Sequence, residues 1–198
     1  MHISEGVLSS PVLVSGMAMA AAGTAIGLKK LDYDHIAKAG MLSAAFFVAS
    51  LIHVPIGPSN AHLVLNGIVG LLLGWAAFPA ILVALILQAV LFQFGGITTL
   101  GVNTVIMALP AVACYLAFGP LIRTKKSVAV AAAFACGAGS VLMGAVLVGL
   151  ALMFTEKNFF EVSAIVVAAH LPVMIIEGIV TALCVAFLKK VQPELLNG

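Results

Sequence analysis

Met1 and His2 are the residues of this sequence that could bind a transition metal with no further folding. The α-amine of Met1, the backbone nitrogen of His2 and Nδ1 of its imidazole would close a five-membered and a six-membered ring near one plane. Planar nitrogen coordination suits Ni(II) or Cu(II), whereas Zn(II) prefers a tetrahedron and Mg²⁺ or Ca²⁺ prefer oxygen. Because many proteins begin with Met-His by chance, this prediction requires a fourth donor.

Two other histidines, His62 and His53, are candidates for the fourth donor. His62 follows the run 55–61, which contains proline and glycine, and it opens an expected helix, so its imidazole could reach a protein-lined cavity. His53 lies at the end of the preceding expected helix. A lone histidine at such a position is more often a satisfied polar residue than a ligand, and this alternative stays open for both.

Several polar residues could support a metal-bound imidazole, which usually donates its second N–H to a nearby carbonyl or carboxylate. Glu5, Asn60 and Asn103 are candidates for this role, and ordinary loop capping is the alternative for each. His170 and Glu177 are weaker candidates. They share one helix face but lie about 10 Å apart along its axis, too far to pair directly. Glu177 is an ionisable group inside a helix, for which a structural role or a partner contact is favoured over catalysis.

The composition predicts an integral membrane protein. Of the 198 residues, 63% are hydrophobic and 8% are charged, and the mean hydropathy is +1.25. Soluble domains are roughly 45–50% apolar and about 25% charged. The apolar composition of this chain therefore excludes a soluble enzyme, a nucleic-acid-binding module and a disordered regulator. Since each helical crossing needs about 20 apolar residues, residues 1–198 form a single transmembrane domain.

We expect an all-α bundle of about seven transmembrane helices. Charged residues and turn formers separate the apolar runs, whose expected bounds are 9–28, 37–54, 61–75, 79–94, 103–122, 127–154 and 164–188. The third and fourth runs are short, so they are tilted or the loop before them is re-entrant. Glycines in the first and sixth runs predict close helix packing, either within the chain or against a partner helix.

The basic residues predict the orientation. With the N-terminus outside and the C-terminus inside, only Lys157 lies outside, and eight basic residues lie inside: Lys29, Lys30, Lys38, Arg123, Lys125, Lys126, Lys189 and Lys190. This split follows the positive-inside rule. All nine basic residues lie at the ends of runs or between them, which disfavours a retinal-type photoreceptor. We also expect Met1 to be retained, because the chain starts without a basic signal-peptide region and His2 is large.

Motifs of common enzymes are absent from the sequence. It has no phosphate-binding P-loop, no H-E-x-x-H zinc motif and no G-x-S-x-G nucleophile elbow. Glu177 is the one acid inside an expected helix, which disfavours a stand-alone proton-coupled pump. We therefore expect a transporter component rather than an enzyme, with a partner supplying energy for uphill transport.

Four motifs together resemble the CbiM/NikM family. They are the opening MHISEG, the stretch 54–67 around His62, the run FGGITTLGVN at 94–103, and His170-Leu171-Pro172 leading to Glu177-Gly178. Members are substrate-binding S components of energy-coupling-factor transporters for cobalt or nickel in prokaryotes. The resemblance implies that the Met1 amine, the His2 backbone nitrogen and side chain, and His62 bind Ni(II) or Co(II) as the transported substrate.

The resemblance also implies partners and a location. These are a transmembrane T component, two cytoplasmic ABC-type ATPases, a small accessory membrane subunit, and the lipid bilayer of the prokaryotic inner membrane. Two departures from the family pattern, Ser59-Asn60-Ala61 before His62 and Ile106 after Asn103, leave the metal preference open. The rival readings are a stand-alone secondary metal transporter and a structural membrane subunit that binds no metal.

Overall fold

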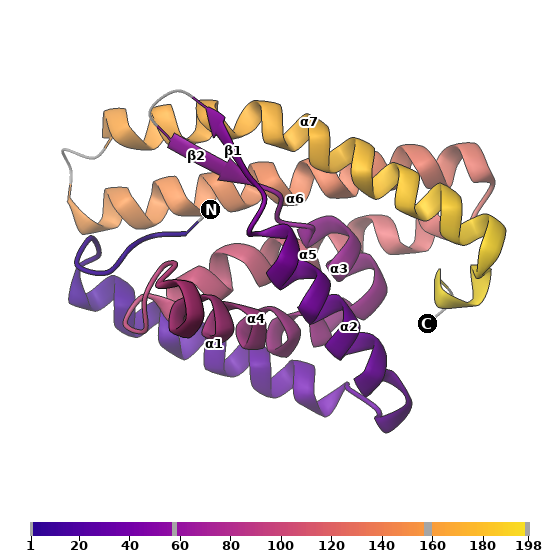
Figure 1. Cartoon of the computed structure of the whole chain (residues 1–198), viewed down its shortest axis with the longest axis horizontal. Helices are drawn as coiled ribbons and strands as arrows, with labels where there is room; N and C mark the ends of the chain where they lie inside the picture. Colours follow the sequence, from indigo (N-terminus) through magenta and orange to yellow (C-terminus); the bar gives the residue numbers. More distant parts are fainter. Residues whose placement is uncertain (1, 57–58, 157–159, 197–198) are drawn as a thin grey trace.

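The computed structural model describes residues 2–56, 59–156 and 160–196, without the side chains of residues 34, 53–56, 59–62 and 160. The described part is a helical bundle with one short hairpin (Figure 1). Its elements, in chain order, are α1 (Ser10–Lys29), α2 (Tyr33–Ala49), β1 (His53–Ile56), β2 (Ser59–His62), α3 (Asn66–Leu73), the 3₁₀ turn η1 (Gly74–Ala76), α4 (Ala77–Phe92), α5 (Leu100–Ile122), α6 (Lys126–Thr155), α7 (Phe160–Val191) and the 3₁₀ turn η3 (Pro193–Leu196).

Five helical stretches of the described residues are long and apolar enough to cross a membrane. They are Ser10–Lys29, Asn66–Phe92, Leu100–Ile122, Lys126–Thr155 and Glu161–Val191, and His35–Ala49 is a shorter apolar helix. Large apolar side chains cover the outside, among them Val14, Leu183 and Phe187, each more than 60% exposed. A surface of this kind suits lipid rather than water.

The region of the second and third expected helices differs from prediction. α2 ends at Ala49, and the expected helix 61–75 is replaced by the end of β2, a short link and the eight-residue α3. Residues 53–56 and 59–62 pair as an antiparallel hairpin, so the fold is not purely α-helical. The ladder bonds satisfy backbone groups that would otherwise be unpaired, which is the condition for non-helical chain among membrane helices.

Glycines let the helices approach closely. The buried residues of α1 are Gly16, Ala20, Gly23 and Gly27. A Cβ at Gly16 would collide with Val102 of α5, and one at Gly23 would collide with the Phe78 ring of α4. The glycine face of α1 is therefore packed inside the chain, which is the first of the two alternatives given for these glycines.

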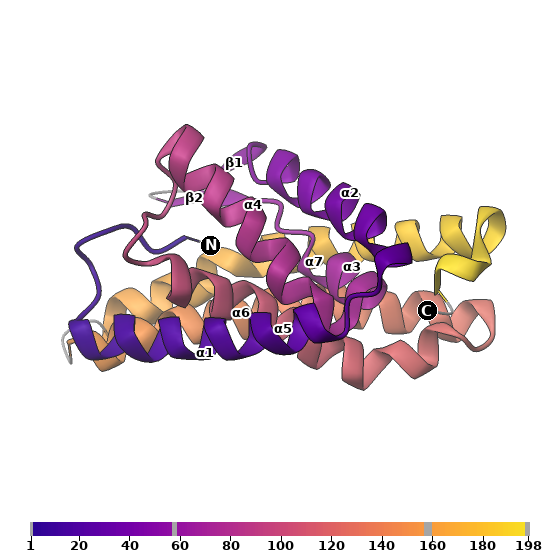
Figure 2. The same cartoon turned by 90° about the horizontal axis from the view of Figure 1, so that it is seen from below.

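The basic residues that the structure describes gather at one end of the bundle, which we call the basic end. Lys189 Nζ at the end of α7 donates to the backbone oxygens of Ile122 (2.8 Å) and Thr124 (2.5 Å), between α5 and α6. Lys38 Nζ of α2 donates to the Leu195 carbonyl in η3 at 3.1 Å. The ends of α1 and α7 and the start of α2 lie together at this end (Figures 1 and 2).

α4 connects the basic end to the opposite end. The start of α4 and the turn before it pack closely against α1. A Cβ at Gly27 of α1 would collide with Trp75 in the turn and with Pro79 in α4. Lys30 Nζ lies 5.9 Å from the centroid of the Trp75 ring. From this turn α4 runs to Gln88, whose side chain contacts His2 in the segment that precedes α1. α4 thus carries its one polar side chain, Gln88, to the end of the molecule where the chain begins.

Candidate metal site

The segment before α1 is an extended strap over the bundle. Residues 2–4 have no regular structure, and a turn at Glu5 and Gly6 leads to α1. Ile3 and Leu8 are buried in the main hydrophobic core, one at each end of the turn. In both views the described start of the chain lies beside β2 (Figures 1 and 2). The strap and the hairpin therefore lie at the same end of the bundle, as a site shared by His2 and His62 would require.

Asn103 holds the backbone of the strap. Its Oδ1 accepts a hydrogen bond from the Ile3 amide at 2.9 Å, and its Nδ2 donates to the Ile3 carbonyl at 3.0 Å. Nδ2 also donates to Thr99 Oγ1 at 3.2 Å. Because Asn103 binds both backbone groups of the residue after His2, it sets where the backbone of His2 lies. In its described hydrogen bonds Asn103 supports the main chain, and its role toward the imidazole stays a prediction.

The His2 imidazole is held by Gln88. His2 Nε2 lies 2.6 Å from Gln88 Oε1, and the Gln88 amide nitrogen donates to Ser50 Oγ at 2.7 Å. The Ser50 hydroxyl in turn donates its single hydrogen to the Phe47 carbonyl at 2.6 Å. Gln88 is wholly buried.

This chain of hydrogen bonds determines the tautomer of His2. Since Ser50 uses its hydrogen on Phe47, its oxygen must accept from the Gln88 amide group, which turns Gln88 Oε1 toward the imidazole. Oε1 can only accept, so His2 Nε2 must carry the hydrogen. When the ring is neutral, its lone pair is then on Nδ1, the nitrogen that an N-terminal chelate needs.

Glu5 binds the loop between α4 and α5. Its Oε1 accepts from the Thr98 amide at 2.9 Å, and its own amide donates to the Gly95 carbonyl at 3.1 Å. The hydrogen bond from the Thr98 amide lowers the pKa of the Glu5 carboxyl below its ordinary value of 4.5. Glu5 therefore closes the strap onto the loop and, in the described contacts, does not touch the imidazole.

Gly96 leaves room for this contact. Its φ of +148° is a conformation that side chains rarely adopt. A Cβ at Gly96 would also collide with Glu5 Cγ. The glycine pair 95–96 thus serves two needs. Both residues have a positive φ in the α4–α5 loop, and Gly96 also leaves space for the Glu5 side chain of the strap.

The hairpin carries the remaining candidate donors. The register pairs His53 with His62 and Pro55 with Asn60 along the ladder. The side chains of His53, Asn60 and His62 lie outside the described residues, as does all of Met1. Their roles as metal ligand or support therefore stay predictions.

Glu177 anchors the chain directly after the hairpin. Its Oε1 accepts from the amides of Val64 and Leu65, the latter at 2.9 Å. Leu65 has a φ of +55° and precedes the first residue of α3. The carboxylate thus fixes the exit of β2, two residues after His62. This is a structural role, one of the two favoured for Glu177 from the sequence.

His170 does not join this contact. Its Nδ1 donates to the Val166 carbonyl one turn earlier in α7, at 2.7 Å. Its Nε2 is buried and has no hydrogen-bond partner within the described part of the chain. His170 and Glu177 therefore bind separate groups, as their spacing on the helix predicted.

Gln88 is the residue that the sequence interpretation missed. A signal was present, because Gln88 is the one side chain in the 16-residue α4 that carries an amide, hydroxyl or charge. A lone glutamine in an apolar helix requires a buried partner. What the sequence could not indicate is that the partner lies 86 residues earlier in the chain.

Known proteins resemble the whole chain. The family model "CbiM: Cobalt uptake substrate-specific transmembrane region" matches residues 2–195. A "Putative metal transport protein" of Haemophilus influenzae is 40% identical over 200 residues, covering 100% of this chain and 97% of the relative. A "Fused nickel transport protein NikMN" of Rhodobacter capsulatus is 34% identical over 221 residues, covering 99% of this chain and 64% of the relative.

A solved structure shares the fold. The crystal structure of a transition metal transporter superposes with a TM-score of 0.75 at 27% identity, covering 96% of this chain and 93% of the other. The overall fold of this chain is therefore also found in a solved transition metal transporter.

Proposed function

This chain belongs to the CbiM family of cobalt uptake substrate-specific transmembrane regions, and we propose that it is the substrate-capture subunit of an importer for Ni(II) or Co(II). The metal is the substrate. Its proposed donors are the Met1 amine, the backbone nitrogen and Nδ1 of His2, and His62. This set relies on main-chain nitrogen, and among the described residues no three His, Cys, Asp or Glu side chains gather to hold a metal.

The observation that carries the proposal is the hydrogen-bond chain from His2 through Gln88 to Ser50. It assigns the hydrogen to Nε2 and thereby leaves Nδ1 as the basic nitrogen of the ring. An outer partner that fixes the tautomer and orientation of an imidazole is typical of metal-binding histidines. An imidazole serving only to fill space would not need a wholly buried glutamine whose own amide group is held in turn.

We propose that the ion enters from outside, at the end opposite the basic residues. The positive-inside rule assigns the basic end to the cytoplasmic face. In this orientation the strap and hairpin face outward, where the ion sheds water as it is bound. A transmembrane T component, two cytoplasmic ATPases and a small accessory membrane subunit would complete the importer in the prokaryotic inner membrane. Reorientation driven by the ATPases would then open the site inward.

Metal uptake into proteoliposomes tests this function against its rivals. We expect purified chain to retain Ni(II) or Co(II), as measured by elemental mass spectrometry, and to import it only when the partner subunits and ATP are present. Uptake by the chain alone would identify a secondary transporter. A purified chain that neither retains nor binds either ion would identify a structural subunit.

A further inference from the structure

Two side chains hold α2 to neighbouring elements along its length. Near its start at the basic end, Lys38 Nζ donates to the Leu195 carbonyl of η3 at 3.1 Å. At its middle, the hydroxyl of the buried Ser43 donates to the Ala80 carbonyl of α4 at 2.7 Å. Since Ser43 lies five residues after Lys38, the two contacts are about 7.5 Å apart along the helix axis. α2 is therefore held against η3 at its start and against α4 at its middle.

The other end of α2 reaches the support of the His2 imidazole. Ser50 follows the last residue of α2, and its oxygen accepts from the Gln88 amide group at 2.7 Å. Gln88 Oε1 in turn accepts from His2 Nε2. Ser50 lies seven residues after Ser43, about 10 Å further along the helix axis. The position of Ser50, and with it the orientation of Gln88, therefore depends on how α2 lies against α4.

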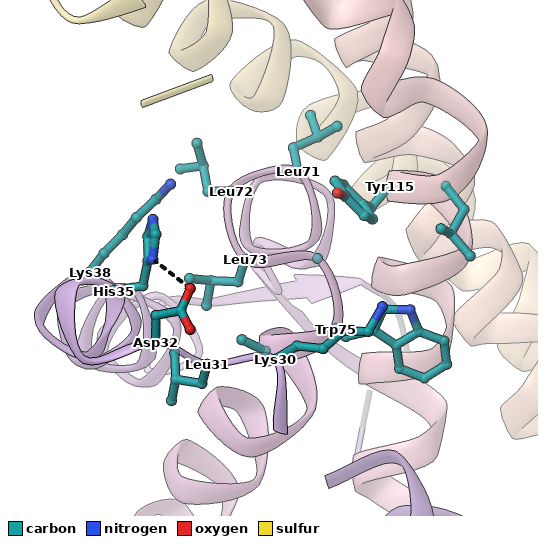
Figure 3. A pocket seen from close by; sticks show the side chains of 13 residues that line it. Lys30, Leu31, Asp32, His35, Lys38, Leu71, Leu72, Leu73, Trp75 and Tyr115 are labelled. Atoms are coloured by element: carbon teal, nitrogen blue, oxygen red, sulfur yellow. Dashed lines mark ion pairs between the residues drawn. The ribbon is translucent and has the colours of Figure 1, made fainter. Parts of the chain in front are cut away.

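A cavity of about 340 Å³ adjoins the start of α2 at the basic end. Asp32, His35 and Lys38 line it on the side of α2, and Leu72 and Leu73 of α3 lie across from them (Figure 3). Protein interiors are ordinarily close-packed, so that a helix cannot shift without displacing its neighbours. Because this cavity separates the start of α2 from α3, that part of α2 has room to move toward α3.

The outward side of α2 is also loosely surrounded. Ile36, Met41 and Val48 are each more than 45% exposed, and a Cβ at Gly40 would meet nothing within 4 Å. Figure 2 shows α2 at the margin of the bundle, beside α4. The contact of Ser43 with α4 therefore holds a helix that has space on both sides of its first half.

We propose that α2 is a lever that couples the basic end of the molecule to the metal site, with the Ser43 contact as its pivot. Movement of the start of α2 into the cavity would displace Ser50 in the opposite direction, so that it no longer holds the Gln88 amide group. The His2 imidazole would then lose the partner that fixes its tautomer. A partner subunit that draws Lys38 away from Leu195 would thereby speed release of the ion. The lever rests on the proposed function and supplies the regulation of its metal site.

The rate at which Ni(II) leaves the purified full chain tests the start of the lever. Bound Ni(II) is released into an excess of a chelating dye and followed by stopped-flow absorbance. We expect Lys38→Met, which removes the contact with Leu195 and keeps the aliphatic stem, to speed release roughly 2–30-fold. The matched control is Lys126→Met, which removes an exposed charge from the same end and should release Ni(II) at the wild-type rate.

The same measurement tests the pivot. We expect Ser43→Ala to speed release as well, because α2 loses its hydrogen bond to α4. Ser140→Ala is the matched control, since the hydroxyl of the wholly buried Ser140 donates to the Gly137 carbonyl of its own helix and ties no two helices together. Equal release rates in the Ser43 and Ser140 variants would contradict a pivot at Ser43.

A double-mutant cycle determines whether α2 acts through Ser50. Ser50→Ala removes the acceptor for the Gln88 amide group, so Lys38→Met should add nothing to the release rate in that background. An unchanged rate in Lys38→Met alone, or the same increase with and without Ser50, would overturn the lever while leaving the metal site in place. A wild-type chain that binds no Ni(II) would refute the metal site, and the lever with it.

Hydrogen exchange gives a second readout, because coupling between two sites is reciprocal. Binding of Ni(II) should slow amide exchange at residues 33–40, at the far end of α2 from Ser50, and Ser50→Ala should abolish this protection. Residues 126–133, which begin α6 at the same end of the molecule, are the internal control. No slowing at residues 33–40, or equal slowing in both segments, would contradict the lever.

Discussion

Gln88 is the single residue on which the geometry of the His2 imidazole depends most. It accepts from Nε2 and is itself fixed by Ser50, so that Nδ1 faces away from the glutamine. Asn103 and Glu5 act on the main chain around His2 rather than on its ring. Together, Gln88, Asn103 and Glu5 hold two adjacent donors of the proposed chelate in one orientation.

Replacing Gln88 should weaken metal binding. We expect Gln88→Leu to lower the affinity for Ni(II) about 10–100-fold, the cost typical of losing an outer partner of a metal-bound imidazole. Gln88→Glu keeps an acceptor for Nε2 and should lose less. Isothermal titration calorimetry measures both, with Gln192→Leu, at an exposed residue after α7, as the matched control. Unchanged affinity in Gln88→Leu would contradict the assigned tautomer.

Glu5 should make the closed strap sensitive to acid. Its pKa is lowered in the folded chain by the Thr98 amide, so its contribution to stability is present above pH 4.5 and is lost as the pH falls through the lower, folded value. We expect the difference in melting temperature between the wild type and Glu5→Gln to shrink from pH 7 to pH 3.5. Thermal unfolding of metal-free protein measures it, and a difference that grows on acidification would refute the contact.

At the scale of elements, the strap, the hairpin and the α4–α5 loop form the end of the bundle at which the metal site is proposed. Each is held by a residue distant in sequence: Asn103 for the strap, Glu177 for the chain after the hairpin, and Glu5 for the loop. The helices provide the frame, and these side-chain contacts place the non-helical segments on it.

Glu177 should control the hairpin through its acceptor oxygen rather than through its charge. Glu177→Gln keeps one acceptor for the Val64 and Leu65 amides, whereas Glu177→Leu leaves both buried and unpaired at about 1–3 kcal/mol each. We therefore expect the leucine variant to lose thermal stability and metal affinity and the glutamine variant to retain most of both. Equal thermal stability and metal affinity in the two variants would show that the Glu177 carboxylate does not hold the hairpin.

Gly96 should be intolerant of any side chain. We expect Gly96→Ala to displace Glu5 from the loop and to weaken metal binding, since its Cβ would occupy the place of the Glu5 side chain. Gly40→Ala in α2 is the matched control, because a Cβ there meets nothing within 4 Å. Metal titration of both variants measures the effect. Wild-type metal affinity in Gly96→Ala would contradict the requirement for a glycine at this position.

The elements that could be predicted from the sequence are those whose signal is local. The runs 9–28, 103–122, 127–154 and 164–188 correspond to α1, α5, α6 and α7 within four residues, because an apolar run of that length has few other stable forms in a membrane. The hairpin and the short α3 could not be predicted in this way. Their conformation depends on Glu177, which lies 112 residues after Leu65.

The donors themselves stay a prediction from the chemistry of the adjacent residues Met1 and His2. The structure holds the His2 imidazole against Gln88, whose amide group contacts Ser50, three residues before the hairpin. Glu5, Asn60 and Asn103 were the candidates for support of the imidazole, and the structure adds Gln88, which the sequence interpretation did not include. Which polar group reaches the ring depends on how α4 packs beneath the strap, and no local pattern specifies that packing.

At the scale of the whole molecule, the chain has two different ends. The strap, hairpin and α4–α5 loop form one, and the described basic residues form the other. The proposed function would use this asymmetry, with metal capture at one end and partner subunits at the other.

The central claim is that the first nitrogen of the chain is a metal ligand. Extending the chain by two residues before Met1 removes the α-amine and leaves the helices unchanged, and the same extension at the C-terminus is the control. We expect Ni(II) affinity, measured by calorimetry, to fall by more than the 10–100-fold of an outer-partner change, with the control unaffected. An N-terminally extended chain that binds Ni(II) as tightly as the native chain would contradict the proposed site.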